Sequence, residues 1–127
     1  MMRKKRILLA DDSPVIQSLT RNILQAQGFE VEGVKKGNPV PDMVRTGKYH
    51  LLILDLMLPD TNGIDIARQL RALPGKASEI PIIAISGNTE DYSPDDLKAA
   101  GIDSFLAKPI NYDELLKTIQ ALLNLNL

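Results

Sequence analysis

The segment YHLLILDLMLPD, residues 49–60, joins an unbroken apolar run to a single carboxylate. Residues 51–54 are leucine or isoleucine, and Asp55 follows them directly. A short apolar run of this kind, bounded by polar or turn residues, is typical of a strand buried on both faces of a parallel sheet. Asp55 is therefore expected at the carboxyl end of a central strand.

Four further apolar runs have similar lengths and similar polar or turn boundaries. They are residues 7–10, 29–34, 81–85 and 104–107. Helical patterns lie between these runs. Ser13 and Pro14 form an N-cap followed by proline at the first helical position. Apolar residues then recur every fourth position over residues 15–23, and Gly28 ends this predicted helix.

Three other helices are predicted from similar start and stop signals. The first carries apolar residues at helical spacing over residues 66–73 and ends at a Pro-Gly pair. The second begins at the Ser-Pro pair 93–94 and ends at Gly101, and the third follows Asn111.

The segment GNPVPDMVRTG, residues 37–47, is a weaker helical pattern. Its two prolines, Pro39 and Pro41, limit any helix to about residues 42–46. A short or irregular helix is expected there.

The alternation of strands and helices predicts an α/β fold, with a parallel sheet and helices on both faces. The 127 residues are 44% hydrophobic, which suits one domain spanning residues 1–127. The net charge of −1 gives no general attraction to nucleic acid, and the absence of cysteine excludes disulfides and thiolate chemistry. No apolar run has the length of a membrane span. A cytoplasmic protein without direct nucleic-acid or membrane contacts is expected.

Polar side chains follow four of the five predicted strands. Asp11 and Asp12 follow the first strand, Asp55 the third, Ser86 the fourth and Lys108 the fifth. Ligands of open parallel α/β sheets bind at this edge, so these side chains are expected to converge. Three carboxylates without histidine or thiol suit Mg2+, and a carboxylate can act as a nucleophile toward phosphorus. Lys108 and the metal ion would balance phosphoryl charge, and Ser86 would donate one hydrogen bond.

Each of these residues alone has an ordinary explanation. An aspartate after a strand often caps a helix or forms a turn, and Asp12 or Ser13 can cap the first helix. Lys108 alone would be a surface lysine. Capping, however, does not require a lysine-proline pair after the last strand. The joint occurrence at four strand ends therefore favours a chemical site.

Four motifs, LLADD, LLILDLMLPDTNG, IIAISG and FLAKP, together resemble the receiver domain of two-component response regulators, in order across essentially the whole chain. The resemblance implies a flavodoxin-like (βα)5 fold, a three-layer sandwich whose five-stranded parallel sheet has the order 2-1-3-4-5. It also implies that Asp55 is the phosphoacceptor and that Asp11 and Asp12 help to bind Mg2+. Ser86 would be the switch hydroxyl, and Lys108 would contact the phosphoryl group.

Two more residues take roles only through this resemblance. The backbone carbonyl of Met57 is expected on the metal, and Phe105 stands at the switch aromatic position. The Lys108–Pro109 peptide bond is expected to be cis. The chain departs from the family in its proline-broken segment 37–47 and in Phe105, which lacks the hydroxyl that many relatives carry.

The expected function is that of a signalling switch. A phosphohistidine on a histidine kinase or histidine phosphotransfer protein would donate to Asp55 with Mg2+ bound. The chain would be no enzyme beyond self-catalysed phosphorylation and dephosphorylation of its own aspartate. The new charge would draw Ser86 in and let Phe105 pack inward. A downstream protein effector would then read the surface formed by residues 93–101, 104–107 and the last helix.

Three rival functions fit the sequence less well. An aspartyl-phosphate hydrolase of the dehalogenase type resembles a strand ending in Asp-x-Asp, but Met57 stands at the second position and cannot transfer a proton. A binding module without phosphorylation predicts loss of an acid or of Lys108, and both are present. A Rossmann nucleotide-binding domain needs a glycine-rich motif after the first strand, and residues 11–16 contain no glycine.

Overall fold

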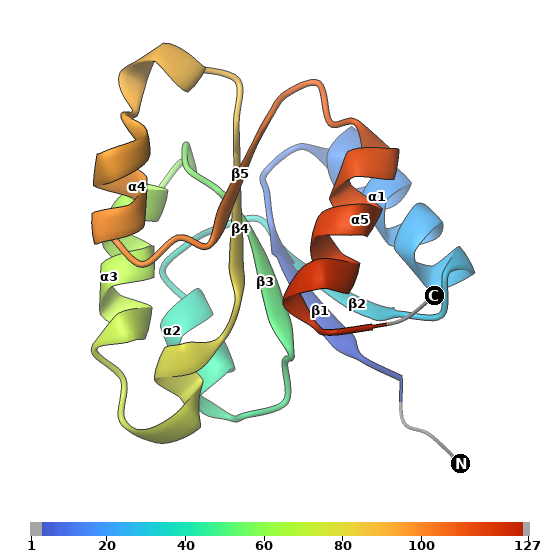
Figure 1. Cartoon of the computed structure of the whole chain (residues 1–127), viewed down its shortest axis with the longest axis horizontal. Coiled ribbons are helices and arrows are strands. Elements are labelled where there is room, and N and C mark those ends of the chain that lie inside the picture. The colour runs from blue at the N-terminus through green and yellow to red at the C-terminus, as the bar shows by residue number, and fades with distance from the viewer. Residues whose placement is uncertain (1–3, 126–127) are drawn as a thin grey trace.

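Five parallel strands form one sheet in the order β2-β1-β3-β4-β5 in the computed structural model, which describes residues 4–125 (Figure 1). The strands are β1 (Arg6–Ala10), β2 (Glu30–Val34), β3 (Leu51–Asp55), β4 (Ile82–Ser86) and β5 (Ser104–Ala107). The predicted strand order and fold class are confirmed. Residues 1–3 and 126–127 of the expected domain lie outside the described residues.

Helices cover both faces of this sheet and complete a three-layer arrangement. Figure 1 shows α1 and α5 on one face and α2, α3 and α4 on the other. Their bounds are α1 (Pro14–Ala26), α2 (Val40–Arg45), α3 (Gly63–Arg71), α4 (Pro94–Ala99) and α5 (Tyr112–Leu122). Two short 3₁₀ helices, η1 (Gly75–Glu79) and η2 (Thr89–Asp91), flank β4. Among residues 4–125, every helix is too short or too polar to span a bilayer.

The core divides into two apolar clusters because side chains alternate between the faces of a strand. In β1, Ile7 and Leu9 belong to the cluster under α1 and α5, and Leu8 and Ala10 to the cluster under α2, α3 and α4. All residues of β3 and β4 are buried. This two-sided burial explains why the central strands read as continuous apolar runs.

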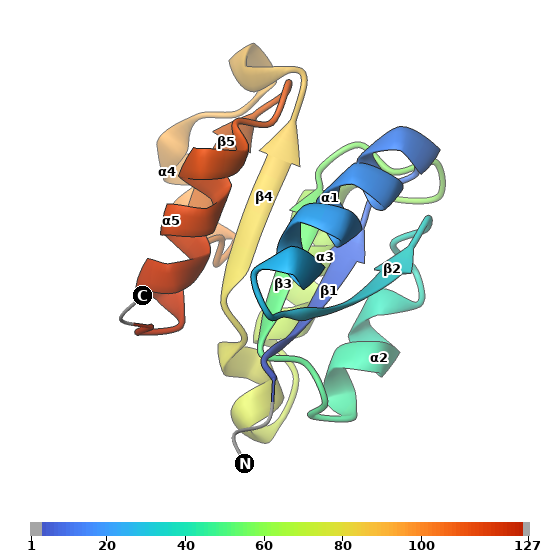
Figure 2. The same ribbon diagram turned by 90° about the vertical axis from the view of Figure 1, so that its right-hand side faces the viewer.

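The carboxyl ends of the strands lie at one edge of the sheet, as the arrowheads in Figure 2 show. Local caps fix how the chain leaves this edge. The side chains of Ser13, Asn62, Ser93 and Asn111 each accept a backbone hydrogen bond at a helix start. The predicted start signals at Ser13 and Ser93 are therefore confirmed.

Helix α2 differs from the sequence expectation, because it begins at Val40 rather than near residue 42. Pro41 lies in its first turn, where a backbone N–H has no partner within the helix, so proline is tolerated there. The expectation of a short helix is correct, since α2 has 6 residues.

The buried face of α1 also differs from the expected apolar stripe. Val15 and Leu19 are 72% and 46% exposed, whereas Gln17, Thr20 and Leu24 are buried. The four-residue spacing identified the helix correctly, but Val15 and Leu19 do not lie on its buried face. Two polar side chains therefore occupy the interior between α1 and the sheet.

Candidate functional site

Three carboxylates meet at the carboxyl ends of β1 and β3. Asp55 is the last residue of β3, and Asp11 and Asp12 follow β1. Carboxylate oxygens of the three residues all lie within 4.8 Å of one another. Asp11 is fully buried, Asp55 is 3% exposed, and Asp12 is exposed to solvent. The sheet therefore brings the three predicted acids together and leaves one of them open to solvent.

The turn after β1 fixes Asp11 through its backbone and its side chain. The Asp11 N–H donates to the Val34 carbonyl at 3.0 Å. Asp11 Oδ1 accepts a 2.8 Å hydrogen bond from the Ser13 N–H, and Ser13 Oγ accepts from the Ile16 N–H at 3.2 Å. Asp11 is thus a turn former and a member of the acidic cluster at once.

Lys108, which follows β5, places its ammonium group between two of the acids. Lys108 Nζ donates to Asp55 Oδ2 at 2.8 Å and lies 3.0 Å from Asp11 Oδ2. Among residues 4–125, no donor is aligned to hydrogen-bond with the buried Asp11 Oδ2. The contact between Lys108 and Asp11 is therefore an ion pair, and the aligned hydrogen bond belongs to Asp55. The Lys108–Pro109 peptide bond is cis, as expected.

Burial and charge act in opposite directions on these groups. Burial raises the pKa of the Asp11 carboxyl above its ordinary value, and the nearby Asp55 charge adds to this, while the hydrogen bond from Ser13 and the Lys108 ammonium group oppose it. Burial would lower the pKa of Lys108, but the hydrogen bond to Asp55 and the ion pairs with Asp55 and Asp11 raise it overall. Lys108 is therefore cationic at neutral pH.

The donor set fits Mg2+. Three carboxylates lie together and one ammonium group, that of Lys108, pairs with two of them, so the cluster carries excess negative charge when all are ionised. Within residues 4–125 the buried Asp11 Oδ2 accepts no hydrogen bond, so apart from its ion pair with Lys108 it keeps its lone pairs for a metal ion. Hard oxygen ligands of this kind are those that Mg2+ prefers.

Ser86 ends the strand next to that of Asp55 but makes no hydrogen bond to it within the described part of the chain. It is the last residue of β4 and is buried, and its Oγ accepts a 3.1 Å hydrogen bond from the Asn88 N–H. The Asn88 amide contacts Met57 Sδ at 3.0 Å, and the Met57 N–H donates to Asp55 Oδ1 at 2.9 Å.

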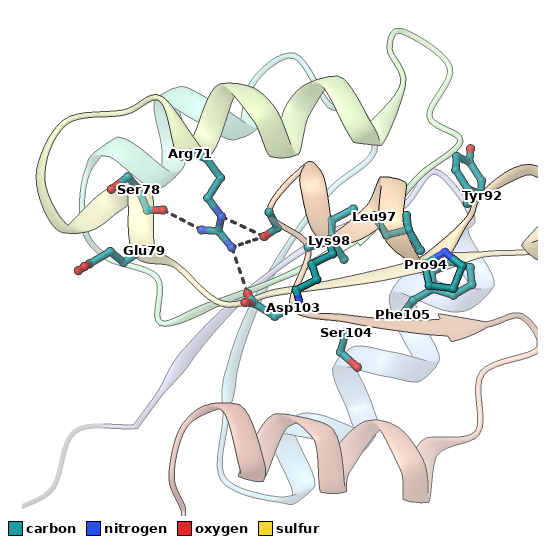
Figure 3. A pocket seen from close by; sticks show the side chains of 12 residues that line it. Arg71, Ser78, Glu79, Tyr92, Pro94, Leu97, Lys98, Asp103, Ser104 and Phe105 are labelled. Atoms are coloured by element: carbon teal, nitrogen blue, oxygen red, sulfur yellow. Dashed lines mark hydrogen bonds and ion pairs between the residues drawn. The ribbon is translucent and has the colours of Figure 1, made fainter.

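Phe105 lies away from the acids, in the layer between the sheet and α4. Its ring centroid is 6.5 Å from that of Tyr92, with an interplanar angle of 55°. Both rings line a pocket of about 810 Å³ beside α4, together with Leu97 and Lys98 (Figure 3). The pocket is separate from the acidic cluster, and Phe105 is the predicted site residue that lines it.

Asp60 is a residue of this region that the sequence did not single out. Its Oδ1 accepts from the Gly37 N–H at 2.9 Å and its Oδ2 from the Asn38 N–H at 2.8 Å. The hydrogen bond from Gly37 is the main reason that the pKa of Asp60 is lowered, and the one from Asn38 adds to it. These bonds tie the loop that carries Met57 to the segment before α2. The spacing of residues in the sequence could not predict these two hydrogen bonds, because Asp60 is 23 and 22 residues from its partners.

Residues 7–120 match the response regulator receiver domain family. The DNA-binding response regulator MtrA of Mycolicibacterium smegmatis is 32% identical over 123 residues, which are 97% of this chain and 52% of the relative. The phosphate regulon transcriptional regulatory protein PhoB of Rhizobium meliloti is 32% identical over 118 residues, which are 93% and 52% respectively. The chain spans about half the length of the curated relatives it matches.

Solved structures agree with this assignment. The receiver domain of the sensor histidine kinase PA1611 from Pseudomonas aeruginosa PAO1 has 28% identity and a TM-score of 0.86, over 96% of this chain and 99% of that one. Its structure has a magnesium ion coordinated in the active site cleft. The chemotaxis response regulator CheY4 of Vibrio cholerae has 27% identity and a TM-score of 0.84, over 94% and 99%. The similarity that the four sequence motifs indicate is confirmed, and the chain belongs to the response regulator receiver domain family.

Proposed function

We propose that residues 1–127 form one receiver domain that accepts a phosphoryl group on Asp55 and switches a distant protein-binding surface. The observation that carries this proposal is the arrangement of Lys108 between Asp55 and Asp11, at 2.8 and 3.0 Å. A nucleophilic carboxylate, a second acid and a fixed cation are the groups that phosphoryl transfer to an aspartate requires.

The reaction proposed for Asp55 is transfer from a phosphohistidine. A carboxylate oxygen of Asp55 forms a bond to phosphorus, the bond from phosphorus to the imidazole nitrogen breaks, and the electron pair leaves with the imidazole. Lys108 stays within reach of the oxygens that carry the negative charge. No other residue of this chain is changed covalently, so the proposed activity is that of a phosphoacceptor.

The metal ligands proposed are the carboxylates of Asp11, Asp12 and Asp55 and the backbone carbonyl of Met57. Mg2+ bound there would supply positive charge to the phosphoryl oxygens. The buried Asp11 Oδ2, which has an ion pair with Lys108 but accepts no hydrogen bond within residues 4–125, supports this assignment. Asp12 is exposed and therefore remains accessible to a hydrated cation.

The switch proposed here begins at Ser86. Its hydroxyl oxygen accepts from the Asn88 N–H, so the O–H can donate to a phosphoryl group on Asp55 and would draw the Asn88 backbone along with it. Movement of the loop after β4 would then change the packing of Tyr92 against Phe105, because Tyr92 lies between that loop and α4. The affected surface is the α4-β5-α5 face, which we propose contacts a downstream protein effector.

The donor proposed is a histidine kinase or histidine phosphotransfer protein in the cytoplasm. Large apolar side chains are exposed close to the acids: Met57 follows Asp55 by two residues, and Val15 follows Asp12 by three. Such side chains favour docking of a protein over capture of a small molecule alone. The net charge of −1 favours protein over nucleic acid as the direct partner of this segment.

Intact mass spectrometry tests the proposed acceptor. Acetyl phosphate or phosphoramidate with Mg2+ should add one phosphoryl group to the chain, and Asp55→Asn should abolish the addition. Asp65→Asn is the matched control, because Asp65 is an exposed acid on α3 that pairs with Arg68. Phosphorylation that persists in Asp55→Asn would overturn the proposal.

A further inference from the structure

Gln17 is a polar side chain in the interior, on the inner face of α1. It is 7% exposed and faces the carboxyl ends of β1 and β2. Burying an amide costs free energy unless hydrogen bonds satisfy it. The partners of the Gln17 amide therefore indicate what it contributes.

All three of these partners are backbone carbonyls at the edge of the sheet. Gln17 Nε2 donates to Asp11 O at 2.9 Å, to Val34 O at 2.9 Å and to Leu9 O at 3.2 Å. An amide NH2 has two hydrogens, so one of them is shared between two carbonyls. Val34 O also accepts the Asp11 N–H at 3.0 Å. One side chain thus joins the ends of two strands where the acidic turn begins.

The carbonyl of Asp11 belongs to the planar peptide unit that leads into Asp12. A hydrogen bond to this oxygen therefore fixes the direction in which the chain enters Asp12. The Asp11 carboxylate has contacts of its own, with the Ser13 N–H and Lys108. Among residues 4–125, no residue makes a hydrogen bond or an ion pair with the Asp12 carboxylate, so its position depends on the backbone.

We infer that Gln17 is a positioning residue that orients Asp12 for the divalent cation. This inference rests on the proposed function, because it concerns the same metal site. Gln17 touches neither the cation nor the phosphoryl group and acts through the Asp11–Asp12 peptide unit.

Gly33 in β2 provides a second observation, because it leaves the space that the Gln17 amide occupies. A Cβ at Gly33 would lie 1.8 Å from Gln17 Oε1 and 2.8 Å from Gln17 Cδ. Glycine inside a strand is unfavourable and often marks a close approach of another group. The Gly33 backbone has no positive φ, so the requirement for glycine here is space for the Gln17 amide.

The test uses the full chain and two readouts. Gln17→Met keeps the length of the side chain but removes the donors. Titration with Mg2+ followed by NMR should show about tenfold weaker affinity, the scale usual for groups that orient metal ligands. Without metal, the backbone amides of Asp12 and Ser13 should shift and exchange faster with solvent.

Leu24→Ala is the control for a purely structural effect. Leu24 is fully buried on the same face of α1, about two turns along the helix from Gln17 and farther from the acids. This variant should lower the melting temperature through a cavity but leave the Mg2+ affinity and the Asp12 amide unchanged.

Gly33→Ala provides a second variant that retains the Gln17 amide but displaces it. It should weaken Mg2+ binding as Gln17→Met does. In a Gln17→Ala background, Gly33→Ala should cause little further loss, because the Gln17 amide is gone and the remaining close group, Arg21 Nη2 at 2.9 Å, ends a flexible side chain that can move. Unchanged Mg2+ affinity and unchanged Asp12 amide signals in both single variants would overturn the inference alone. A wild-type chain that binds no Mg2+ would instead overturn the proposed function, and the inference with it.

Discussion

Lys108 Nζ donates a 2.8 Å hydrogen bond to Asp55 Oδ2, although 53 residues separate the two in sequence. The same ammonium group lies 3.0 Å from Asp11 Oδ2. In the absence of metal and phosphoryl group, Lys108 therefore neutralises part of the charge that a divalent cation would otherwise neutralise. Lys108 and a divalent cation therefore compete for the carboxylate oxygens of Asp11 and Asp55.

Removal of the lysine should therefore strengthen metal binding. Lys108→Ala leaves Asp11 and Asp55 without their cation, and we expect several-fold tighter Mg2+ binding by calorimetric titration, because like charges then meet unopposed. Lys98→Ala, an exposed lysine on α4, is the control and should bind Mg2+ as the wild type does. Weaker binding by Lys108→Ala would mean that Lys108 helps to build the metal site.

The acids themselves should account for the effect of Mg2+ on stability. Millimolar Mg2+ should raise the melting temperature of the wild type, since a ligand that binds only the folded state stabilises it. The double variant Asp11→Asn plus Asp12→Asn should lose this dependence. Differential scanning calorimetry with and without Mg2+ checks the prediction. An equal increase in wild type and variant would remove both residues from the metal site.

Asp60 should make stability depend on pH in the acid range. Its pKa is lowered in the folded state, mainly by the hydrogen bond from the Gly37 N–H, so the unfolded chain binds a proton more readily. This contribution is present above the ordinary aspartate pKa and is lost as pH falls through the lowered value. Asp60→Asn should reduce the melting temperature by a few degrees at pH 7. The melting temperature of the variant should also fall less steeply than that of the wild type as the pH is lowered. Identical profiles for variant and wild type would contradict this role.

The fold could be predicted from the sequence because its signals are local. The apolar runs 51–54 and 82–85 are long enough to identify buried strands, and Ser13 and Ser93 mark helix starts within a few residues. The proximity of Asp11, Asp55 and Lys108 could be predicted because strand ends of a parallel sheet must share an edge. Gln17 could not be assigned, because apolar spacing gives no information on a buried polar side chain whose partners are backbone carbonyls.

The contacts of Arg71 could not be predicted from the sequence either, because its partners are remote in sequence or are backbone atoms. From the end of α3 it donates to the carbonyls of Ser78, Ile80 and Gly101 and to the Asp103 carboxylate, at 2.6–3.0 Å (Figure 3). Nothing in the residue type or spacing identifies these acceptors. In the structure they join α3, η1 and the turn before β5.

Loss of these hydrogen bonds should destabilise the chain strongly. Arg71→Met keeps much of the apolar stem but leaves several carbonyls without donors, so we expect a loss of roughly 2–4 kcal/mol in the free energy of unfolding. Urea denaturation measures it. Arg68→Met, which removes an exposed arginine whose pair with Asp65 spans 3.8 Å, should change stability by less than about 0.5 kcal/mol. Similar losses in the two variants would mean that the Arg71 bonds are weak.

The coupling between Asp55 and the α4-β5-α5 face can be followed with beryllofluoride, a stable mimic of the phosphoryl group. With beryllofluoride and Mg2+, NMR signals of the wild type should shift at Ser86, at Phe105 and along α4. The physical reason is that the Ser86 O–H donates to the mimic while its oxygen still accepts the Asn88 N–H, so the loop that precedes Tyr92 follows the hydroxyl. Phe105 then repacks against Tyr92.

Two variants separate the steps of this coupling. Ser86→Ala removes one hydrogen bond, and Lys108→Ala removes a charge, so both should bind the mimic at Asp55 with reduced or absent shifts at Phe105. Leu19→Ala is the control, because Leu19 is 46% exposed on α1, which covers the opposite face of the sheet from α4, and should leave the shifts unchanged. Shifts confined to neighbours of Asp55 in the wild type would indicate a phosphate site without a switch. If the Ser86→Ala variant still shows the full shifts at Phe105, the coupling does not depend on the Ser86 hydroxyl.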